Sequence, residues 1–253
     1  MKPTMIKQMG VMLVASTVLV GCLMGCSNSA GNSIGASSAS MDAAYPVVYN
    51  YGGREVTFDE APKKILTSGP TSAIYAAELA EKGQFAYRSG EFKDPNPEAD
   101  AMGAKIISDS ELSTESIISQ DVDLVITDTF TGFDPEKVEA AGIKVIMPNS
   151  GVAHAKADGA GSLVVPEGTP FELISKDLRE LGKVLGHPER GEQKAEEFEK
   201  QVAELDKSKP GKGKTAVMLF YFSPEYPVMS VSNASIEGQI EVEIGRASCR
   251  ERV

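Results

Sequence analysis

Short apolar runs alternate with segments of helical spacing through the middle of the chain. The run 64–68 is followed by a turn, Gly69-Pro70-Thr71-Ser72, and then by apolar positions at helical spacing. The same order returns after residue 121, where Pro135 and Gly142 suit the first turn and the C-terminal end of a second helix. Buried strands that alternate with helices predict an α/β fold with a parallel sheet. The predicted strands are 64–68, 122–127 and 143–147, and the predicted helices are 73–81 and 135–141.

Residues 171–207 form the longest region of helical spacing, which Gly186-His187-Pro188 interrupts. As one straight helix this region would be roughly 50 Å long, enough to bridge two lobes. A turn at 209–213 follows, and the apolar run 215–222 would open a second sheet. We therefore expect two α/β lobes with flanking helices, a helical spine between them and an incomplete second lobe.

The N-terminus has the features of an export signal, because two lysines precede an apolar run at 11–20 and small residues beside cysteine. The run is half as long as the ~20 residues of a membrane span. Leu19-Val20-Gly21-Cys22 and Leu23-Met24-Gly25-Cys26 both resemble the lipobox of bacterial lipoproteins, whose cysteine is lipidated. We favour Cys26 because polar residues follow it directly, with Cys22 as the alternative site. An ordinary secretory signal with two incidental cysteines is the competing interpretation.

The two ends of the chain are set apart from the predicted folded body. Serine, alanine and glycine dominate the stretch that follows the signal, which predicts a flexible linker. At the other end, 243–253 resembles a sequencing adapter translated in frame, so we expect an artefact there and a natural chain that is cut off at about Val242. The expected divisions are a signal peptide at 1–25, a linker at 26–43, the N-terminal lobe at 44–170, the spine at 171–208, the start of the C-terminal lobe at 209–242 and the tail at 243–253.

Charge and composition narrow the classes of function. The net charge is −11, and the expected body is more acidic still because both excluded ends are net basic; such a surface disfavours nucleic acid. With Cys249 in the tail, the body has no cysteine, and His154 and His187 are the only histidines of the chain, so no metal site is predicted. Dinucleotide, Walker and Gly-x-Ser-x-Gly motifs are missing from the sequence, which favours a binding protein over an enzyme.

Three stretches in this order resemble the siderophore, haem and cobalamin class of ABC-transporter substrate-binding proteins: Ala61-Pro62-Lys63-Lys64-Ile65-Leu66-Thr67-Ser68; Ser113-Thr114-Glu115-Ser116-Ile117-Ile118 running into Asp123-Leu124-Val125-Ile126-Thr127; and Leu178-Arg179-Glu180-Leu181-Gly182-Lys183-Val184-Leu185-Gly186. The likeness extends from residue 55 to about residue 240. It implies a ligand held between two lobes, an iron- or cobalt-containing chelate as that ligand, no permanent cofactor, and a membrane permease with its ATPase as partners. It also implies a site of action outside the cell membrane. A sensor that binds another small solute without transport is the alternative.

The resemblance gives Glu115 the task of docking to arginines of the permease. Alternatively, Glu115 only favours the start of a helix whose N-cap is Ser113 or Thr114. Ligand contacts are expected from loops at the carboxyl ends of strands, where a guanidinium could grip the anionic oxygens of a chelate through paired hydrogen bonds. Arg88 is the candidate for that role; the alternative is that Arg88 is an exposed loop residue without a ligand. Tyr87 and Phe130 could flank a chelate or belong to the core. The candidate ligand residues are Ser68, Thr71, Tyr87, Arg88, Thr129, Phe130, Tyr221 and Tyr226.

Overall fold

The computed structural model describes residues 45–90, 97–157, 162–208, Lys212 and four two-residue strands between Thr215 and Ser248. Cys22, Cys26, the linker, Tyr221 and Tyr226 lie outside the described residues, as does the side chain of His154. No helix in the described part of the chain has both the length and the apolar character needed to cross a membrane.

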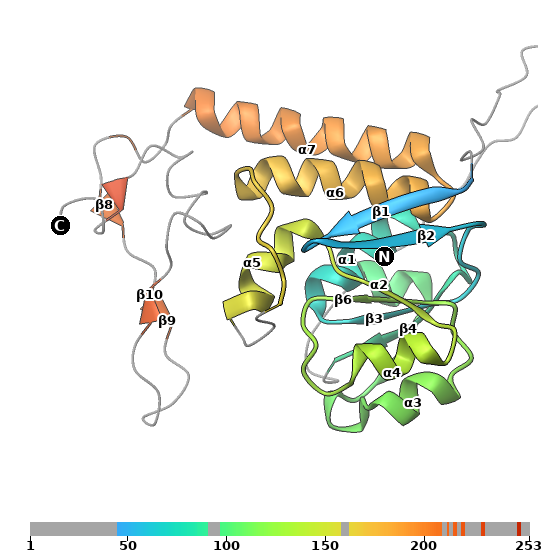
Figure 1. The fold of residues 1–253 in the computed structure, drawn as a ribbon. Coiled ribbons are helices and arrows are strands. Elements are labelled where there is room, and N and C mark those ends of the chain that lie inside the picture. Colours follow the sequence, from blue (N-terminus) through green and yellow to red (C-terminus); the bar gives the residue numbers. More distant parts are fainter. Residues whose placement is uncertain are drawn as a thin grey trace, which may run out of the picture. The chain divides into compact units, whose positions relative to one another are not determined.

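A parallel sheet of five strands, in the order β5-β4-β3-β6-β7, forms the centre of the fold (Figure 1). The strands predicted at 64–68, 122–127 and 143–147 are confirmed as β3, β6 and β7, whereas β4 and β5 were not predicted. Every residue of β3 and β6 is buried, which explains their continuous apolar sequences. The bounds are β3 Ile65–Ser68, β4 Phe85–Ser89, β5 Lys105–Ile107, β6 Leu124–Thr127 and β7 Lys144–Ile146.

The chain changes direction across the sheet between β3 and β6. From β3 it moves outward to β4 and β5 on one side, and it then returns to build β6 and β7 on the other side. The carboxyl ends of β3 and β6 therefore flank the point at which the strand order reverses. In open parallel sheets, ligands bind in the crevice outside this point.

Helices cover both faces of the sheet. One core cluster joins β3, β6 and β7 to α1 and α6, and a second cluster packs α3 and α4 on the opposite face. The helices predicted at 73–81 and 135–141 are confirmed as α1 and α4, although α1 begins at Pro70. The bounds are α1 Pro70–Leu79, α2 Pro97–Met102, α3 Thr114–Ser119, α4 Pro135–Ala140 and α5 Asn149–Ala157, with a 3-10 turn at Asp109–Glu111.

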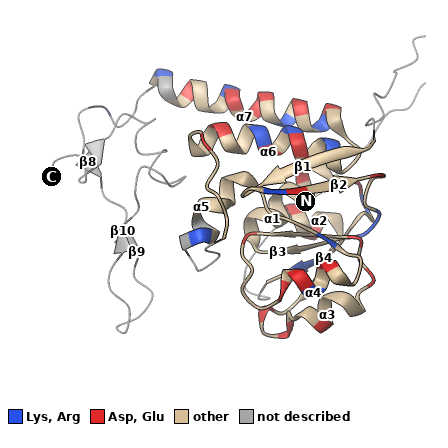
Figure 2. Ribbon diagram, in the orientation of Figure 1, with Lys and Arg blue, Asp and Glu red and all other residues tan. Residues whose placement is uncertain are grey.

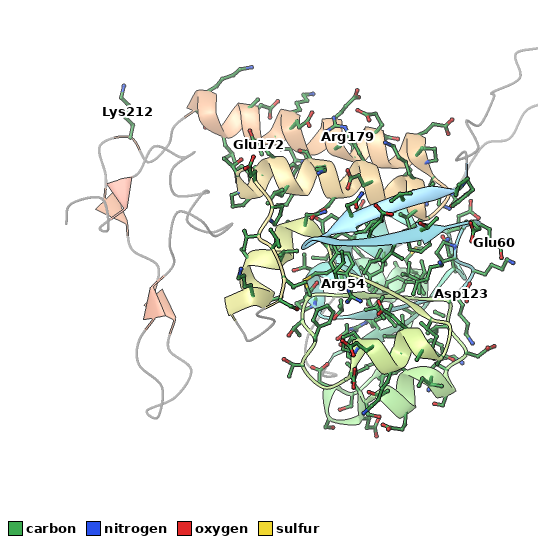
Figure 3. The ribbon with its side chains drawn as sticks, viewed as in Figure 1. Arg54, Glu60, Asp123, Glu172, Arg179 and Lys212 are labelled. Atoms are coloured by element: carbon green, nitrogen blue, oxygen red, sulfur yellow. The ribbon has the colours of Figure 1, made fainter. Side chains whose placement is uncertain are left out.

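An antiparallel hairpin, β1 Val47–Tyr51 and β2 Arg54–Phe58, precedes the sheet and was not predicted. Its Gly52-Gly53 turn has positive φ at both residues, as a tight hairpin turn requires, and this pair was the signal available in the sequence. Tyr51 donates a hydrogen bond to a backbone carbonyl of β7, and Arg54 (labelled in Figure 3) pairs with Glu139 of α4 at 2.7 Å. The hairpin is thereby fixed to the edge of the sheet.

The predicted spine is two helices, α6 Pro170–Val184 and α7 Pro188–Ser208, that pack against each other in antiparallel directions. The predicted interruption is confirmed: the His187 N–H bonds to the Gly182 carbonyl at 2.7 Å, and Gly186 has φ +89°. The region therefore does not have the length of roughly 50 Å that a straight helix of these residues would have. The chain reverses at Gly186, and the helices approach so closely that a Cβ on Gly182 would lie 2.7 Å from the Gly191 Cα.

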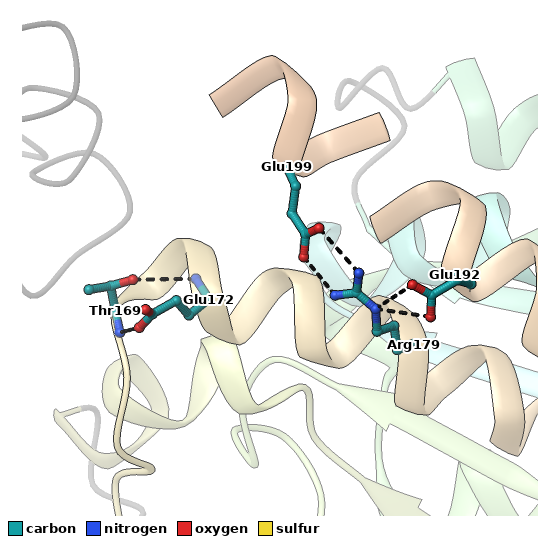
Figure 4. Close-up of polar contacts among 5 residues, drawn as sticks. All are labelled: Thr169, Glu172, Arg179, Glu192 and Glu199. Atoms are coloured by element: carbon teal, nitrogen blue, oxygen red, sulfur yellow. Dashed lines mark hydrogen bonds and ion pairs between the residues drawn. The ribbon is translucent and has the colours of Figure 1, made fainter. Parts of the chain in front are cut away.

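Charged side chains join α6 to α7 on their outer surface, where acidic and basic residues are interspersed (Figure 2). Arg179 of α6 forms ion pairs with Glu192 and Glu199 of α7, at 2.9 and 2.6 Å (Figure 4). A capping box between Thr169 and Glu172 fixes the start of α6. The ion pairs thus join α6 to α7, and the capping box defines where α6 begins.

Beyond α7 the described residues form short strand pairs. The single strand predicted at 215–222 is replaced by two short strands, β8 Thr215–Ala216 and β9 Leu219–Phe220. β9 pairs in the antiparallel sense with β10 Met229–Ser230. β8 pairs in parallel with β11 Ala247–Ser248, which lies within the tail that we expected to be an artefact.

Candidate functional site

The candidate site is the carboxyl edge of the sheet at the reversal between β3 and β6. Gly69, Pro70 and Thr71 follow β3 there, and Asp128, Thr129 and Phe130 follow β6. The opposite edge is closed by Asp123 (labelled in Figure 3), whose carboxylate accepts hydrogen bonds from the N–H groups of Lys63 and Lys64. The carboxyl edge is therefore the one that carries the predicted ligand residues.

Asp128 joins the two loops of this edge. Its carboxylate accepts hydrogen bonds from the N–H groups of Thr71 and Ser72, both at 2.8 Å, and from the Ser72 hydroxyl. Burial raises the pKa of Asp128, and the hydrogen bonds from Ser72 and Thr71 act in the opposite direction. Asp128 was not predicted as a site residue, although an aspartate directly after a buried strand was the available signal.

Gly69 makes this close approach possible. It has φ +108°, and a Cβ at this position would lie 2.4 Å from Oδ2 of Asp128. The Gly69 N–H donates to the hydroxyl of Ser89 at 3.1 Å. A glycine is required here because both the backbone conformation and the adjacent carboxylate exclude a side chain.

Three of the predicted ligand residues meet at this edge. Thr71, Thr129 and Phe130 are each partly exposed, and they flank Asp128, Thr71 from the first turn of α1 and the other two from the loop after β6. The hydroxyl of Thr129 hydrogen-bonds that of Thr131 at 3.0 Å, and the Phe130 ring packs edge-on against Phe133 with centroids 6.3 Å apart. The edge thus presents hydroxyl groups beside one aromatic ring.

The other described candidates lie within the strands of the sheet, Ser68 in β3 and Tyr87 and Arg88 in β4. Ser68 is buried at the end of β3. Tyr87 packs against the second core cluster, with the ammonium groups of Lys64 and Lys105 within 6 Å of its ring centroid. The location of Tyr87 agrees with the alternative that it belongs to the core.

Arg88 is only 3% exposed and does not project from a loop as its alternative interpretation required. Its guanidinium pairs with Asp100 of α2 at 2.9 Å. The Nε atom of Arg88 is buried, and within the described part of the chain it has no hydrogen-bond partner. Contact between Arg88 and a ligand would therefore require its buried side chain to become accessible.

A second buried carboxylate holds the next loop of the same edge. Asp177 of α6 accepts hydrogen bonds from the N–H groups of Asn149 and Ser150 at the start of α5, both at 2.8 Å. The hydroxyls of Tyr49 and Tyr75 approach it at 3.4 and 3.5 Å. Burial raises the pKa of Asp177 to about 6, against the opposing effect of these backbone hydrogen bonds.

A groove of about 420 Å³ adjoins the edge between α1, α6 and α7. Ile74 of α1 is half exposed on its wall, and Lys194 of α7 pairs with Glu78 across it at 2.7 Å. The lining residues are Thr71, Ile74, Tyr75, Glu78, Ile174, Leu178, Lys194, Glu197, Phe198 and Gln201.

Glu115 is exposed in the first turn of α3. Ser113 is the N-cap, as one alternative predicted, because its hydroxyl accepts from the Ser116 N–H at 3.1 Å. Within the described ranges, no group of three or more His, Cys, Asp or Glu side chains could hold a metal ion.

A family model described as "Periplasmic binding protein" matches residues 91–240, more than half of the chain. The chain belongs to the periplasmic binding protein family. Members of this family are substrate-binding proteins and not enzymes, so the match agrees with the sequence-based expectation. Comparison with curated protein sequences gives no significant match.

Solved structures share the fold of this periplasmic binding protein. The Fe³⁺-hydroxamate transport protein from Saccharomonospora viridis DSM 43017 is 22% identical, with a TM-score of 0.52 over 70% of this chain and 61% of the other. The heme binding protein HmuT is 19% identical, with a TM-score of 0.55 over 83% and 65%. The siderophore binding protein BauB, solved with acinetobactin and ferric iron, is 13% identical, with a TM-score of 0.59 over 81% and 68%. The predicted α/β fold is thereby confirmed. The chain spans 58% to 65% of the length of the first three matching structures.

Proposed function

We propose that this chain is the substrate-binding component of an ABC importer and captures a metal chelate outside the cell membrane. The observation that carries the proposal is the family match over residues 91–240. The geometry supports it, because two loops fixed by Asp128 present hydroxyl and aromatic side chains where open α/β sheets bind ligands.

A ferric siderophore or haem is the ligand class that we favour, with cobalamin as a further candidate. Structures with the same fold are named for Fe³⁺-hydroxamate transport, for haem and for a ferric siderophore. The hydroxyls of Thr71 and Thr129 suit the peripheral oxygens of such a chelate, and the Phe130 ring suits its flat organic part.

The protein would deliver its ligand to a permease that is driven by an ATPase, with Glu115 as the docking residue of this lobe. The exposed position of Glu115 in α3 leaves its carboxylate accessible to a partner. A lipid anchor at Cys26, or at Cys22, would hold the protein at the membrane surface.

Ligand titration tests the proposal directly. The chain has seven tyrosines and no tryptophan, so tyrosine fluorescence reports binding of ferric hydroxamates, ferric catecholates, haem and cobalamin. We expect saturable binding of at least one chelate, and about five- to tenfold weaker binding in Phe130→Ala, as loss of an aromatic contact implies. Ile118→Ala, which removes an exposed apolar side chain from α3, is the control and should bind normally. Binding of a sugar, peptide or amino acid with no chelate bound would refute the ligand class.

Transport requires a separate measurement. Glu115→Ala should leave chelate binding unchanged and reduce uptake in cells that contain the permease, because its partner would be a protein. Glu111→Ala, in the preceding 3-10 turn, is the matched control with an exposed acidic residue. Normal uptake by Glu115→Ala would remove the docking role, and ligand binding without any uptake would favour a sensor.

A further inference from the structure

The N-terminus of α1 lies where a parallel α/β sheet ordinarily receives an anion. Free N–H groups and the helix dipole favour negative charge at such a position. In this protein the N–H groups of Thr71 and Ser72 are already occupied by the carboxylate of Asp128, each at 2.8 Å. The chain therefore supplies its own anion to this position.

Among the described residues, the side chains that flank Asp128 at this edge carry no positive charge. Asp128 is flanked by Thr71, Thr129 and Phe130, which are uncharged. The arginine expected to bind anions, Arg88, is buried and paired with Asp100.

The adjoining groove is also not a cationic surface. Its ammonium group, on Lys194, lies 2.7 Å from a carboxylate oxygen of Glu78 and 3.4 Å from one of Glu197. Two carboxylates thus face one cation in the groove, and Asp128 adds a further negative charge at its end.

We propose that Asp128 determines ligand specificity by charge, so that this lobe accepts an uncharged ferric hydroxamate and disfavours anionic chelates. The inference rests on the proposed function and narrows its ligand class. Three hydroxamate groups, each with a single negative charge, neutralise ferric iron. A ferric tris-catecholate is a trianion, and haem carries two propionates.

The physical reason is repulsion in a partly buried site. A carboxylate fixed by three hydrogen bonds cannot turn away from an approaching anion, and the reduced dielectric at the edge strengthens the interaction. At the effective dielectric of a protein surface, one like charge within ~8 Å weakens binding by about tenfold or more. An uncharged chelate avoids this loss and retains the hydroxyl contacts.

The test compares Asp128→Asn with Asp177→Asn in the full chain. Each variant replaces a carboxylate that accepts hydrogen bonds from two successive N–H groups at the start of a helix. The difference is exposure, since Asp177 is fully buried and Asp128 is partly exposed at the edge. The probes are ferrichrome, an uncharged hydroxamate complex, and ferric enterobactin, an anionic catecholate complex. Asp128→Ser, whose hydroxyl can still cap α1, serves as a second uncharged variant if Asp128→Asn does not fold.

We expect the wild-type chain to prefer ferrichrome. In Asp128→Asn the ratio of the affinity for ferric enterobactin to the affinity for ferrichrome should rise at least about tenfold over wild type, whereas Asp177→Asn should keep the wild-type ratio. A wild-type preference for ferric enterobactin, or an unchanged ratio of the two affinities in both Asp128 variants, would overturn the inference while the proposed function stands. Failure of every chelate to bind would overturn both.

Discussion

The buried carboxylate of Asp177 makes the stability of this fold depend on pH in a direction that can be measured. Burial raises the pKa of Asp177 from its ordinary 3.8 to about 6. Because the folded state holds the proton more tightly, the contribution of Asp177 to stability is fully present below about pH 4 and is lost as the pH rises through about 6. A shift of about two pKa units corresponds to about 3 kcal/mol of unfolding free energy.

Comparison with Asp177→Asn isolates this effect, since burial also raises the pKa values of Asp128 and Glu180. Urea unfolding at intervals from pH 4 to pH 7, followed by circular dichroism, gives the free energy of each protein. Across this range the wild type should lose about 2 kcal/mol relative to Asp177→Asn, most of the full effect. The measurement uses the change of stability with pH and not the absolute stability of Asp177→Asn. In this variant an NH₂ group replaces one of the two oxygens that accept hydrogen bonds from the start of α5, which lowers stability at every pH.

Glu172→Gln is a control with the opposite sign. The hydrogen bond from the Thr169 N–H lowers the pKa of Glu172, so its contribution to stability is present above the unfolded-state pKa and is lost as the pH falls. The free energy of unfolding of the wild type should therefore increase relative to that of Glu172→Gln as the pH rises. A flat difference between wild type and Asp177→Asn from pH 4 to pH 7, or one that favours the wild type at higher pH, would refute the reasoning.

Three further substitutions test other parts of the structure. Gly69→Ala should destabilise the fold by more than about 1 kcal/mol in thermal unfolding, because a Cβ would meet a carboxylate; Gly83→Ala, with positive φ but open space, should cost less. Gly182→Ala should also destabilise despite the better helix propensity of alanine, since α7 lies too close, whereas Gly151→Ala in open space should be neutral or stabilising by up to about 1 kcal/mol. Cys26→Ala should abolish most incorporation of labelled fatty acid in a bacterial host; full labelling would contradict the choice of Cys26.

Local sequence patterns sufficed for the elements whose environment is uniform along the chain. The strands β3, β6 and β7 were predictable because buried parallel strands are apolar on both faces, and all residues of β3 and β6 are buried. The break between α6 and α7 was predictable because Gly186 and Pro188 act on the backbone beside them. The capping of α3 by Ser113 is equally local.

Elements without such a uniform pattern were missed. β4 mixes Phe85 and Tyr87 with Arg88, whose charge pointed to a loop although its side chain is buried through an ion pair with Asp100. The β1–β2 hairpin was missed although two signals mark it, the alternation of buried and more exposed residues along its strands and the Gly52-Gly53 turn.

Of the candidate site, the sequence determined the loops and several of their side chains, since a loop after a buried strand can be located from the strand alone. Tertiary structure decided which loops meet and what charge they carry. Asp128 reaches the start of α1 across 56 residues of sequence, and Asp177 reaches the start of α5 across 27. Periodicity identifies a buried position but not its distant partner, and the antiparallel packing of α6 on α7 depends on contacts of the same long-range kind.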